Sequence, residues 1–167
     1  MLIMGLDPGL RTTGWGLIEA NHNHIAMRKS GTIKIDHRGN LASRLCQLFY
    51  ALEQIIQTHS PDVCSVEDMF VSHNGQTTLK LGHARSVILL VPSLKNLDIY
   101  EYAPTLVKKS VTGSGRADKR QIQRMINILL PNANPDSEHA ADALAVAICH
   151  AQHERKHTSS MQKITNK

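Results

Sequence analysis

The spacing of apolar residues changes twice within the first 67 residues, and this change limits the folds open to the chain. Three segments rich in apolar and β-branched residues, separated by short turns, predict antiparallel strands. They are Leu2 to Leu6, Gly14 to Ala20 and Ile25 to Ile35. From Leu41 the spacing is helical until Ser60-Pro61, and Val63 to Glu67 is a fourth strand. A helical connection of this length permits parallel pairing, so we expect an α/β fold with a mixed sheet.

The remainder of the chain predicts one more strand, Leu97 to Tyr102, and further helices. The predicted helical segments are Thr77 to Val91, a short turn near Pro104 to Ser110, Ala117 to Leu130 and Ala140 to Ala151. The expected sheet has five strands, three antiparallel and then parallel ones, flanked by helices. Residues 1–153 fit a single domain, and the polar, basic residues 154–167 predict a disordered tail.

The composition favours an anionic partner. The formal net charge is +5, and only 4% of the residues are aromatic, which points to nucleic acid bound through phosphate contacts rather than extensive base stacking. Cys46, Cys64 and Cys149 are widely spaced and lie among apolar residues, so we expect buried free thiols and no disulfide. The absence of a signal peptide or a long apolar run predicts a soluble protein in a reducing compartment.

Two acids are expected to end neighbouring strands. Asp7 lies between an apolar run and the glycine-rich segment Gly9 to Gly16, and Glu67 ends the fourth strand. If the first and fourth strands pair in parallel, both carboxylates lie at one end of the sheet. Carboxylate oxygens there are suitable ligands for a hard divalent cation such as Mg²⁺.

A third acid lies at the start of the last helix. Glu138 and His139 are about 40° and 60° from Asp142 around a helix, so all three can face one point. An acid inside an apolar helix, as Asp142 is, costs free energy unless it is paired or metal-bound, whereas Glu138 is typical of a first-turn acid. Three crowded carboxylates with two divalent cations between them favour phosphodiester hydrolysis.

These motifs together resemble the RuvC-type Holliday junction resolvases of the ribonuclease H-like superfamily, over residues 1–153. The matching segments are Gly5 to Gly9, Thr13 to Gly16, Val66 to Phe70, Leu79 to Arg85 and His139 to Ala145. The resemblance implies a ribonuclease H-like fold and a homodimer that nicks two strands of like polarity in a four-way junction. It also implies 5′-phosphate and 3′-hydroxyl products, a branch-migration partner complex of the RuvA/RuvB type and a bacterial-type, nucleoid-associated cytoplasmic location.

The resemblance assigns the catalytic and metal-binding roles to Asp7, Glu67, His139 and Asp142, with two Mg²⁺ ions that Mn²⁺ can replace. His139 departs from the all-carboxylate pattern and is open to three interpretations: a metal ligand, a general base, or a first-turn residue facing solvent. A histidine in place of an acid predicts weaker Mg²⁺ retention and relatively better use of Mn²⁺.

A basic segment and one aromatic residue are the candidate DNA contacts. Six basic residues and one acid lie between Pro104 and Pro131, and the basic ones are Lys108, Lys109, Arg116, Lys119, Arg120 and Arg124. By resemblance, Lys108 and Lys119 contact phosphates, with Lys109 and Arg116 beside them; Arg120 and Arg124 suit a solvated helix face equally well. The resemblance also implies that Phe70 stacks on a base at the branch point. The alternative is that Phe70 packs in the core.

Three other interpretations compete with this one. A junction-binding scaffold without catalysis is suggested by His139, although the three acids argue against it. A phosphotransferase of the actin and sugar-kinase type also begins with an Asp-x-Gly turn, but needs two domains to enclose a nucleotide. His150, His153 and His157 could bind zinc, yet we expect them to be solvated.

Overall fold

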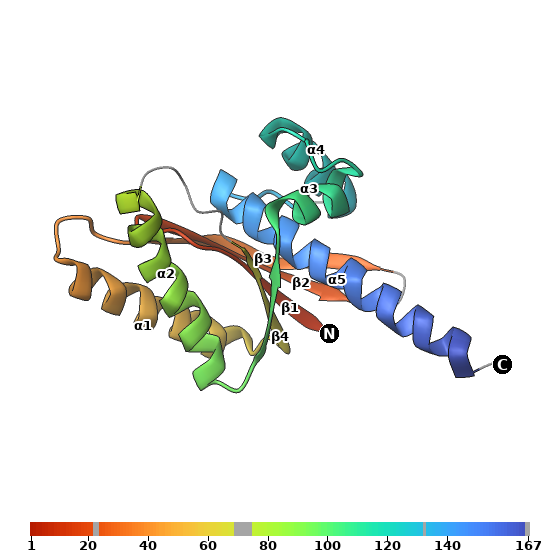
Figure 1. The fold of residues 1–167 in the computed structure, drawn as a ribbon, viewed down its shortest axis with the longest axis horizontal. Coiled ribbons are helices and arrows are strands. Elements are labelled where there is room, and N and C mark those ends of the chain that lie inside the picture. Colours follow the sequence, from red (N-terminus) through yellow and green to blue (C-terminus); the bar gives the residue numbers. More distant parts are fainter. Residues whose placement is uncertain (22–23, 69–74, 132, 166–167) are drawn as a thin grey trace.

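The computed structural model describes residues 1–21, 24–68, 75–131 and 133–165, without the side chains of Thr77 and residues 155–165. The chain begins with three strands, continues with helices and strands in alternation, and ends with three helices (Figure 1). The strands are β1 (Leu2–Asp7), β2 (Thr12–Ala20), β3 (Ile25–Lys34), β4 (Val63–Glu67) and β5 (Asp98–Tyr102). The helices are α1 (Leu41–His59), α2 (Gly75–Leu94), α3 (Pro104–Thr112), α4 (Lys119–Leu129) and α5 (Glu138–Thr165).

The strands form one mixed sheet in the order β3-β2-β1-β4-β5. β1, β2 and β3 pair antiparallel, whereas β4 pairs parallel with β1 and β5 pairs parallel with β4. This arrangement confirms the predicted fold class, and it follows from the connections. Short turns join the antiparallel strands, and the helices α1 and α2 provide the long crossovers that parallel strands need.

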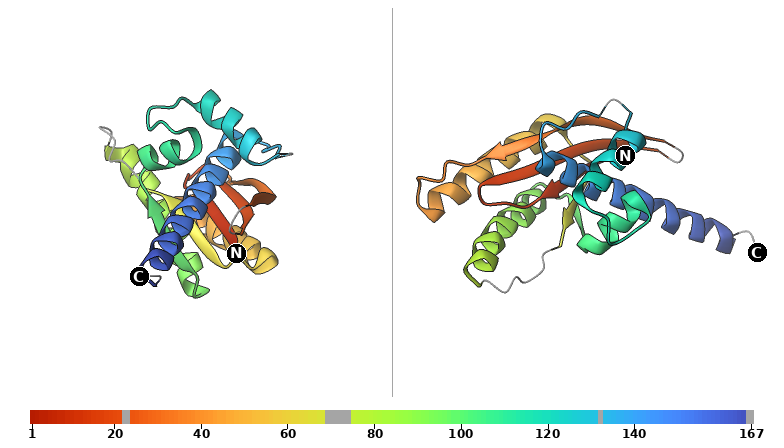
Figure 2. Two further views of the ribbon diagram at one scale, coloured as in Figure 1. Left: turned by 90° about the vertical axis from the view of Figure 1, so that its right-hand side faces the viewer. Right: turned by 90° about the horizontal axis from the view of Figure 1, so that it is seen from above.

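Helices cover both faces of the sheet (Figures 1 and 2). α5 packs across one face, and α1 and α2 cover the other, so the sheet separates two hydrophobic cores. α3 and α4 pack against α5 on the side away from the sheet's other helices. The molecule therefore has a three-layer α/β architecture with the short helices placed beside the first turns of α5.

Side-chain alternation along the strands decides which groups face α5. In β1, Met4 and Leu6 join the core under α1 and α2, while Ile3 joins the core under α5. In β4, Cys64 and Val66 lie in the first of these cores and Val63 in the second. Because side chains alternate between the faces of a strand, the acids that end both strands point toward α5.

Glycines in the sheet allow α5 to approach the strands at backbone distance. A Cβ atom added to Gly5 would lie under 3.0 Å from backbone atoms of Ala143 and Ala147, and one on Gly14 would collide with the backbone of His139. A Cβ atom on Gly16 would likewise lie under 3.0 Å from side-chain atoms of Leu144. The helix contributes alanines to this contact, so neither surface keeps the two backbones apart.

Several boundaries differ from the predicted ones. α2 contains Pro92 and is longer than predicted at both ends, and its Leu79 and Leu90 are 63% and 50% exposed. Cys46 is exposed, contrary to the prediction of buried thiols, because it lies on a face of α1 that does not join the core. Cys64 and Cys149 are buried as expected.

The end of α5 also differs from the prediction. The helix continues to Thr165, through residues for which the sequence predicts a disordered tail. The segment after His153 contains Glu, Arg, Lys, Gln and Met and no Pro or Gly, a composition that favours helix. The polar composition of this segment predicts that its residues are exposed to solvent, but it does not predict where the helix ends. The boundary of the domain at residue 153 stays a prediction.

None of the helices in the described ranges combines the length and the apolar character that a membrane-spanning segment needs.

The glycine contact predicts a large effect of one methyl group. Gly5→Ala should lower the free energy of unfolding by about 1 to 3 kcal/mol or more, because the backbone of α5 must move. Gly82→Ala is the matched control: a Cβ there meets nothing within 4 Å, and alanine should stabilise α2 by about 0.5 to 1 kcal/mol. Urea denaturation of both variants at one protein concentration measures the difference. Equal stabilities would contradict the close contact.

Candidate active site at the end of the sheet

The ends of β1 and β4 place two carboxylates side by side. The two strands pair in parallel up to Leu6 and Val66, so Asp7 and Glu67 come next on adjacent strands. Both face α5, and Asp7 is opposite Gly14 of β2. The Thr13 hydroxyl, fully buried, donates to the Gly9 carbonyl at 2.7 Å and braces the turn that follows Asp7. The sheet thus provides a rigid support for these acids.

The first turn of α5 brings two further polar side chains to the same place. The N–H of Ala140 donates to the Ser137 hydroxyl at 3.1 Å and fixes the start of the helix. His139 Nδ1 lies 2.7 Å from Asp7 Oδ2, and the side chains of His139 and Asp7 are 48% and 15% exposed. Asp142 follows on the same side of the helix, where its charge acts on Asp7 and Glu67. Residues far apart in the sequence therefore converge: Asp7, Glu67, His139 and Asp142.

Burial raises the pKa values of all three acids, and repulsion by neighbouring carboxylates adds to the rise for Glu67 and Asp142. The pKa of Glu67 rises to about 7, first through burial and then through the negative charges of Asp7 and Asp142. Burial also raises the pKa of Asp142, with a second contribution from Asp7. The pKa of Asp7 is raised by burial in spite of its hydrogen bond with His139. Each carboxylate is therefore short of compensating positive charge.

The donor atoms fit a divalent metal ion, although the side chains are not drawn together around one point. Within the described part of the chain, no three His, Cys, Asp or Glu side chains form a group that could hold a metal ion as they stand. The carboxylates of Asp7, Glu67 and Asp142 are nevertheless close enough to shift one another's pKa, and oxygen ligands suit hard cations. Binding requires these side chains to rotate toward one another, which added positive charge favours.

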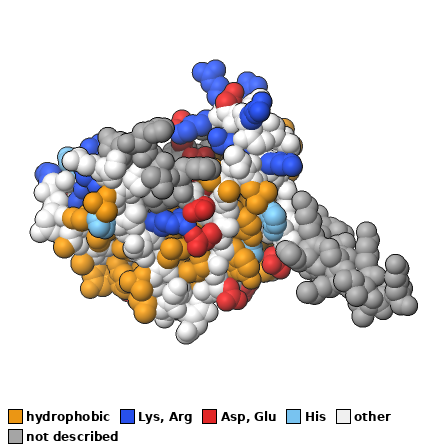
Figure 3. All heavy atoms as spheres, viewed as in Figure 1, with side chains coloured by type: hydrophobic (Ala, Val, Ile, Leu, Met, Phe, Trp, Pro, Cys, Tyr) orange, Lys and Arg blue, Asp and Glu red, His pale blue; other side chains and the backbone are white. Residues whose placement is uncertain are grey.

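Two of the predicted phosphate contacts lie beside the acids. The charge of Lys108 lowers the pKa of Glu67, and the charge of Lys119 lowers those of Asp7 and Asp142. Lys119 Nζ also donates to Glu138 Oε2 at 3.0 Å, on the exposed surface. Glu138 therefore pairs with a lysine. In Figure 3, basic side chains gather over α3 and α4, and acidic ones lie beneath them.

The other predicted DNA contacts are Lys109, Arg116 and Phe70. Lys109 is exposed in the last turn of α3, and Arg116 is exposed between α3 and α4, where its N–H donates to the Ser114 hydroxyl at 3.3 Å. Phe70 lies outside the described residues.

One histidine prediction was wrong. His150 is 1% exposed rather than solvated, and its Nδ1 lies 2.7 Å from the Tyr102 hydroxyl. Burial lowers the pKa of His150, which favours the neutral ring. The side chain of His157 lies outside the described part, so this residue is not placed. His150 contributes to packing between α5 and β5 and not to a solvated face.

Sequence reasoning did not identify the supports of the site, Thr13 and Gly14. Thr13 carries a recognisable signal, since a hydroxyl inside a buried strand needs a hydrogen-bond partner. Gly14 was noted only as part of a glycine-rich segment. Its contact with the backbone of His139 depends on how α5 crosses the sheet, which no local pattern specifies.

The raised pKa of Glu67 predicts a pH-dependent stability. The folded protein binds the Glu67 proton more tightly than the unfolded chain, so this stabilisation is present below about pH 4.5 and is lost as the pH rises through about 7. At pH 8 in EDTA, Glu67→Gln should therefore be more stable than the original chain by about 1 to 3 kcal/mol, allowing for solvent screening. Urea denaturation at pH 4 should show little difference. Glu138→Gln, which removes an exposed acid paired with Lys119, should give no gain, and no gain for Glu67→Gln at pH 8 would contradict the assignment.

Comparison with known proteins identifies the family to which this site belongs. Residues 3–150 match the family model of the crossover junction endodeoxyribonuclease RuvC. The chain is 51% identical over 151 residues to the RuvC of Azorhizobium caulinodans, covering 90% of this chain and 89% of that protein. It is 50% identical to the RuvC of Bartonella henselae over the same length and the same shares.

Solved structures agree with this match. The structure of T. thermophilus RuvC in complex with a Holliday junction substrate aligns with a TM-score of 0.87 and 25% identity, over 95% of this chain and 97% of that one. The yeast mitochondrial Holliday junction resolvase Ydc2 shares the fold, with a TM-score of 0.69 and 13% identity, over 98% of this chain and 85% of that one. The chain therefore belongs to the RuvC family of crossover junction endodeoxyribonucleases.

Proposed function

We propose that the chain resolves four-way DNA junctions in homologous recombination and repair by paired, metal-dependent nicks in strands of like polarity. The observation that carries this proposal is the gathering of Asp7, Glu67 and Asp142 at one end of the sheet, with raised pKa values. Lysines next to these acids suit a phosphodiester backbone. The products are 5′-phosphate and 3′-hydroxyl ends, as the family resemblance implies.

The proposed cofactor is Mg²⁺, two ions at each site, with Mn²⁺ able to replace it. Asp7, Glu67 and Asp142 would hold the ions, and His139 is the fourth candidate ligand. When bound, divalent cations activate a water molecule and stabilise the leaving oxygen of a phosphodiester. The chain's own contribution is to hold these side chains on rigid elements, in a partly buried place where bulk water screens their charges weakly.

His139 has one nitrogen committed and one available. When the His139 ring is neutral and Asp7 is ionised, Nδ1 donates its proton to Asp7 Oδ2 and Nε2 has a lone pair. That nitrogen can accept a proton from water or bind a cation, and the contact with Asp7 fixes the ring in either role. The interaction also explains how a half-exposed histidine is held at the site.

Four basic residues are the proposed DNA backbone contacts: Lys108, Lys109, Arg116 and Lys119. Lys108 and Lys119 lie closest to the acids, where they can bind the phosphates next to the one that is cut. Lys119 must exchange Glu138 for a phosphate oxygen when DNA binds, which is feasible because this exposed ion pair contributes little stability. Phe70 is proposed, by family resemblance, to stack on a base at the branch point.

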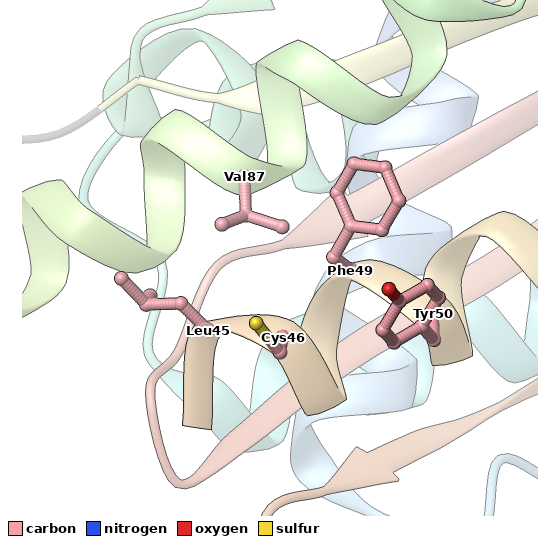
Figure 4. A pocket seen from close by; sticks show the side chains of 5 residues that line it. All are labelled: Leu45, Cys46, Phe49, Tyr50 and Val87. Atoms are coloured by element: carbon pink, nitrogen blue, oxygen red, sulfur yellow. The ribbon is translucent and has the colours of Figure 1, made fainter. Parts of the chain in front are cut away.

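Paired nicks require two active sites, and we propose a homodimer to provide them. An apolar groove of about 310 Å³ lies between α1 and α2 and is lined by Leu45, Cys46, Phe49, Tyr50 and Val87 (Figure 4). Large hydrophobic side chains gather over the same two helices (Figure 3), where Tyr50 is 66% exposed. A second copy of the chain that covers this face would relate two active sites by a two-fold axis, as the symmetry of a junction requires.

A branch-migration complex of the RuvA/RuvB type and a cytoplasmic, nucleoid-associated location complete the proposal. Both come from membership of a bacterial family.

The catalytic part of the proposal predicts the loss of nicking in one variant. With labelled four-way junction, the original chain should make paired nicks in Mg²⁺ or Mn²⁺ and none in EDTA or in a matched linear duplex. Asp7→Asn should lower the nicking rate by more than about 100-fold, beyond the loss typical of residues that only support a metal ligand. Its junction affinity in EDTA should not fall. Tight junction binding without cleavage by the original chain in either metal would favour the scaffold interpretation instead.

The dimer part of the proposal predicts a shift in association. Tyr50→Glu should raise the dimer Kd by about 10-fold or more, because it places a charge in the apolar groove. Ile128→Glu on α4 is the matched control, since Ile128 is equally exposed, at 66%, but lies on another helix. Sedimentation equilibrium measures both. If the two variants dimerise equally well, the groove is not the dimer contact.

A further inference from the structure

A buried arginine lies beneath the end of β4. Arg85 belongs to α2, on the opposite side of the sheet from α5, and its side chain is only 14% exposed. One guanidinium nitrogen, Nη1, donates to the Glu67 carbonyl oxygen at 2.8 Å. The other, Nη2, forms ion pairs with Asp68 Oδ1 at 3.2 Å and with Glu101. A nearly buried cation costs free energy unless it is paired in this way.

Arg85 donates to the Glu67 carbonyl at the position where β1 and β4 stop pairing. β1 and β4 pair only as far as Leu6 and Val66. Two residues after Leu6, just past the end of β1, Pro8 has no N–H to continue the pairing. On the other side, β5 still holds β4, because Glu67 is opposite Tyr102 and the Asp68 N–H donates to the Tyr102 carbonyl at 2.8 Å. Arg85 therefore supplies a side-chain donor on the edge where β1 no longer pairs.

The direction of the Glu67 side chain depends on this backbone. A carboxylate repelled by Asp7 and Asp142, as the raised pKa of Glu67 indicates, would lower its energy by turning away. Fixing the peptide group of Glu67 opposes that movement. An arginine is suited to the task, because its planar fork reaches a carbonyl and two carboxylates at once, whereas a lysine is a point charge.

We infer that Arg85 is a positioning residue that holds the end of β4, so that the Glu67 carboxylate stays directed at Asp7 and Asp142 for cation binding. This inference rests on the proposed function for its catalytic consequence. Arg85 acts through the backbone of Glu67 and through Asp68 and Glu101, and it does not touch the carboxylate of Glu67. It also connects α2, which lines the apolar groove, with the active site.

The test measures cation binding separately from cleavage. Arg85→Ala should weaken Mn²⁺ binding to the protein without DNA, measured by titration calorimetry, by about 10- to 100-fold. The single-turnover nicking rate at a fixed Mn²⁺ concentration should fall, and the junction Kd in EDTA should change by less than threefold, or about 0.6 kcal/mol. Arg85→Lys keeps the charge but not the fork, so it should not restore Mn²⁺ affinity.

Lys95→Ala is the control for general loss of stability. Lys95 follows α2 and forms an ion pair with Glu53 of α1 at 2.7 Å, in which both side chains are about one-third exposed or less. Lys95 lies shortly before Asp98, which pairs with Val63 at the opposite end of β4 from Glu67. This variant should bind Mn²⁺ as the original chain does.

The inference is overturned if Arg85→Ala binds Mn²⁺ normally, if Lys95→Ala weakens Mn²⁺ binding equally, or if Arg85→Lys restores it fully. Arg85→Lys alone decides the question should Arg85→Ala fail to fold. If the original chain binds Mn²⁺ but does not nick junctions, the proposed function is contradicted. The Mn²⁺-binding test of Arg85 remains valid in that case.

Discussion

The contact between α5 and the glycines of β1 and β2 is the constraint on which the active site depends. Gly5, Gly14 and Gly16 let the helix backbone lie where side chains would otherwise separate it from the sheet. At that distance the first turn of α5 brings His139 to Asp7 and Asp142 to the same end of the sheet. A wider spacing would keep the same residues and the same topology, but would separate the acid on the helix from those on the strands.

The electrostatic properties of the site follow from that packing. Burial raises the pKa values of the three carboxylates, the negative charges of neighbouring acids raise those of Glu67 and Asp142 further, and the two nearby lysines offset only part of the negative charge. A site of this kind has a high affinity for positive charge and is maintained by the rigidity of the elements around it. The strand pairing, the Thr13 brace and the Arg85 contacts each limit how far the acids can turn away.

Most of the fold could be predicted from the sequence, because it is determined by local periodicity. The change from alternating to helical spacing at Leu41, and the length of that helix, indicated an antiparallel group followed by parallel strands. Parallel pairing then placed Asp7 and Glu67 at one end. The contact between His139 and Asp7 could not be predicted, since a first-turn histidine faces either solvent or the sheet according to how the helix crosses it.

Other features were misjudged because composition does not specify packing. Apolar neighbours suggested that Cys46 was buried, but it lies on a face of α1 that borders an open groove and does not join the core. Its place on a helix next to the predicted tail suggested that His150 was solvated, but it packs against Tyr102. Arg85 was noted only as the last residue of a segment that resembles the family, because its partners belong to two strands that the sequence cannot place beneath it.

The central claim is that the acids on β1, β4 and α5 form one cation site, and anomalous diffraction from crystals soaked in Mn²⁺ tests it most directly. The account predicts anomalous peaks in contact with the carboxylates of Asp7, Glu67 and Asp142, and the same maps would show whether His139 Nε2 is a ligand. Mn²⁺ bound only at other places, with these three carboxylates making no contact to it, would contradict the account.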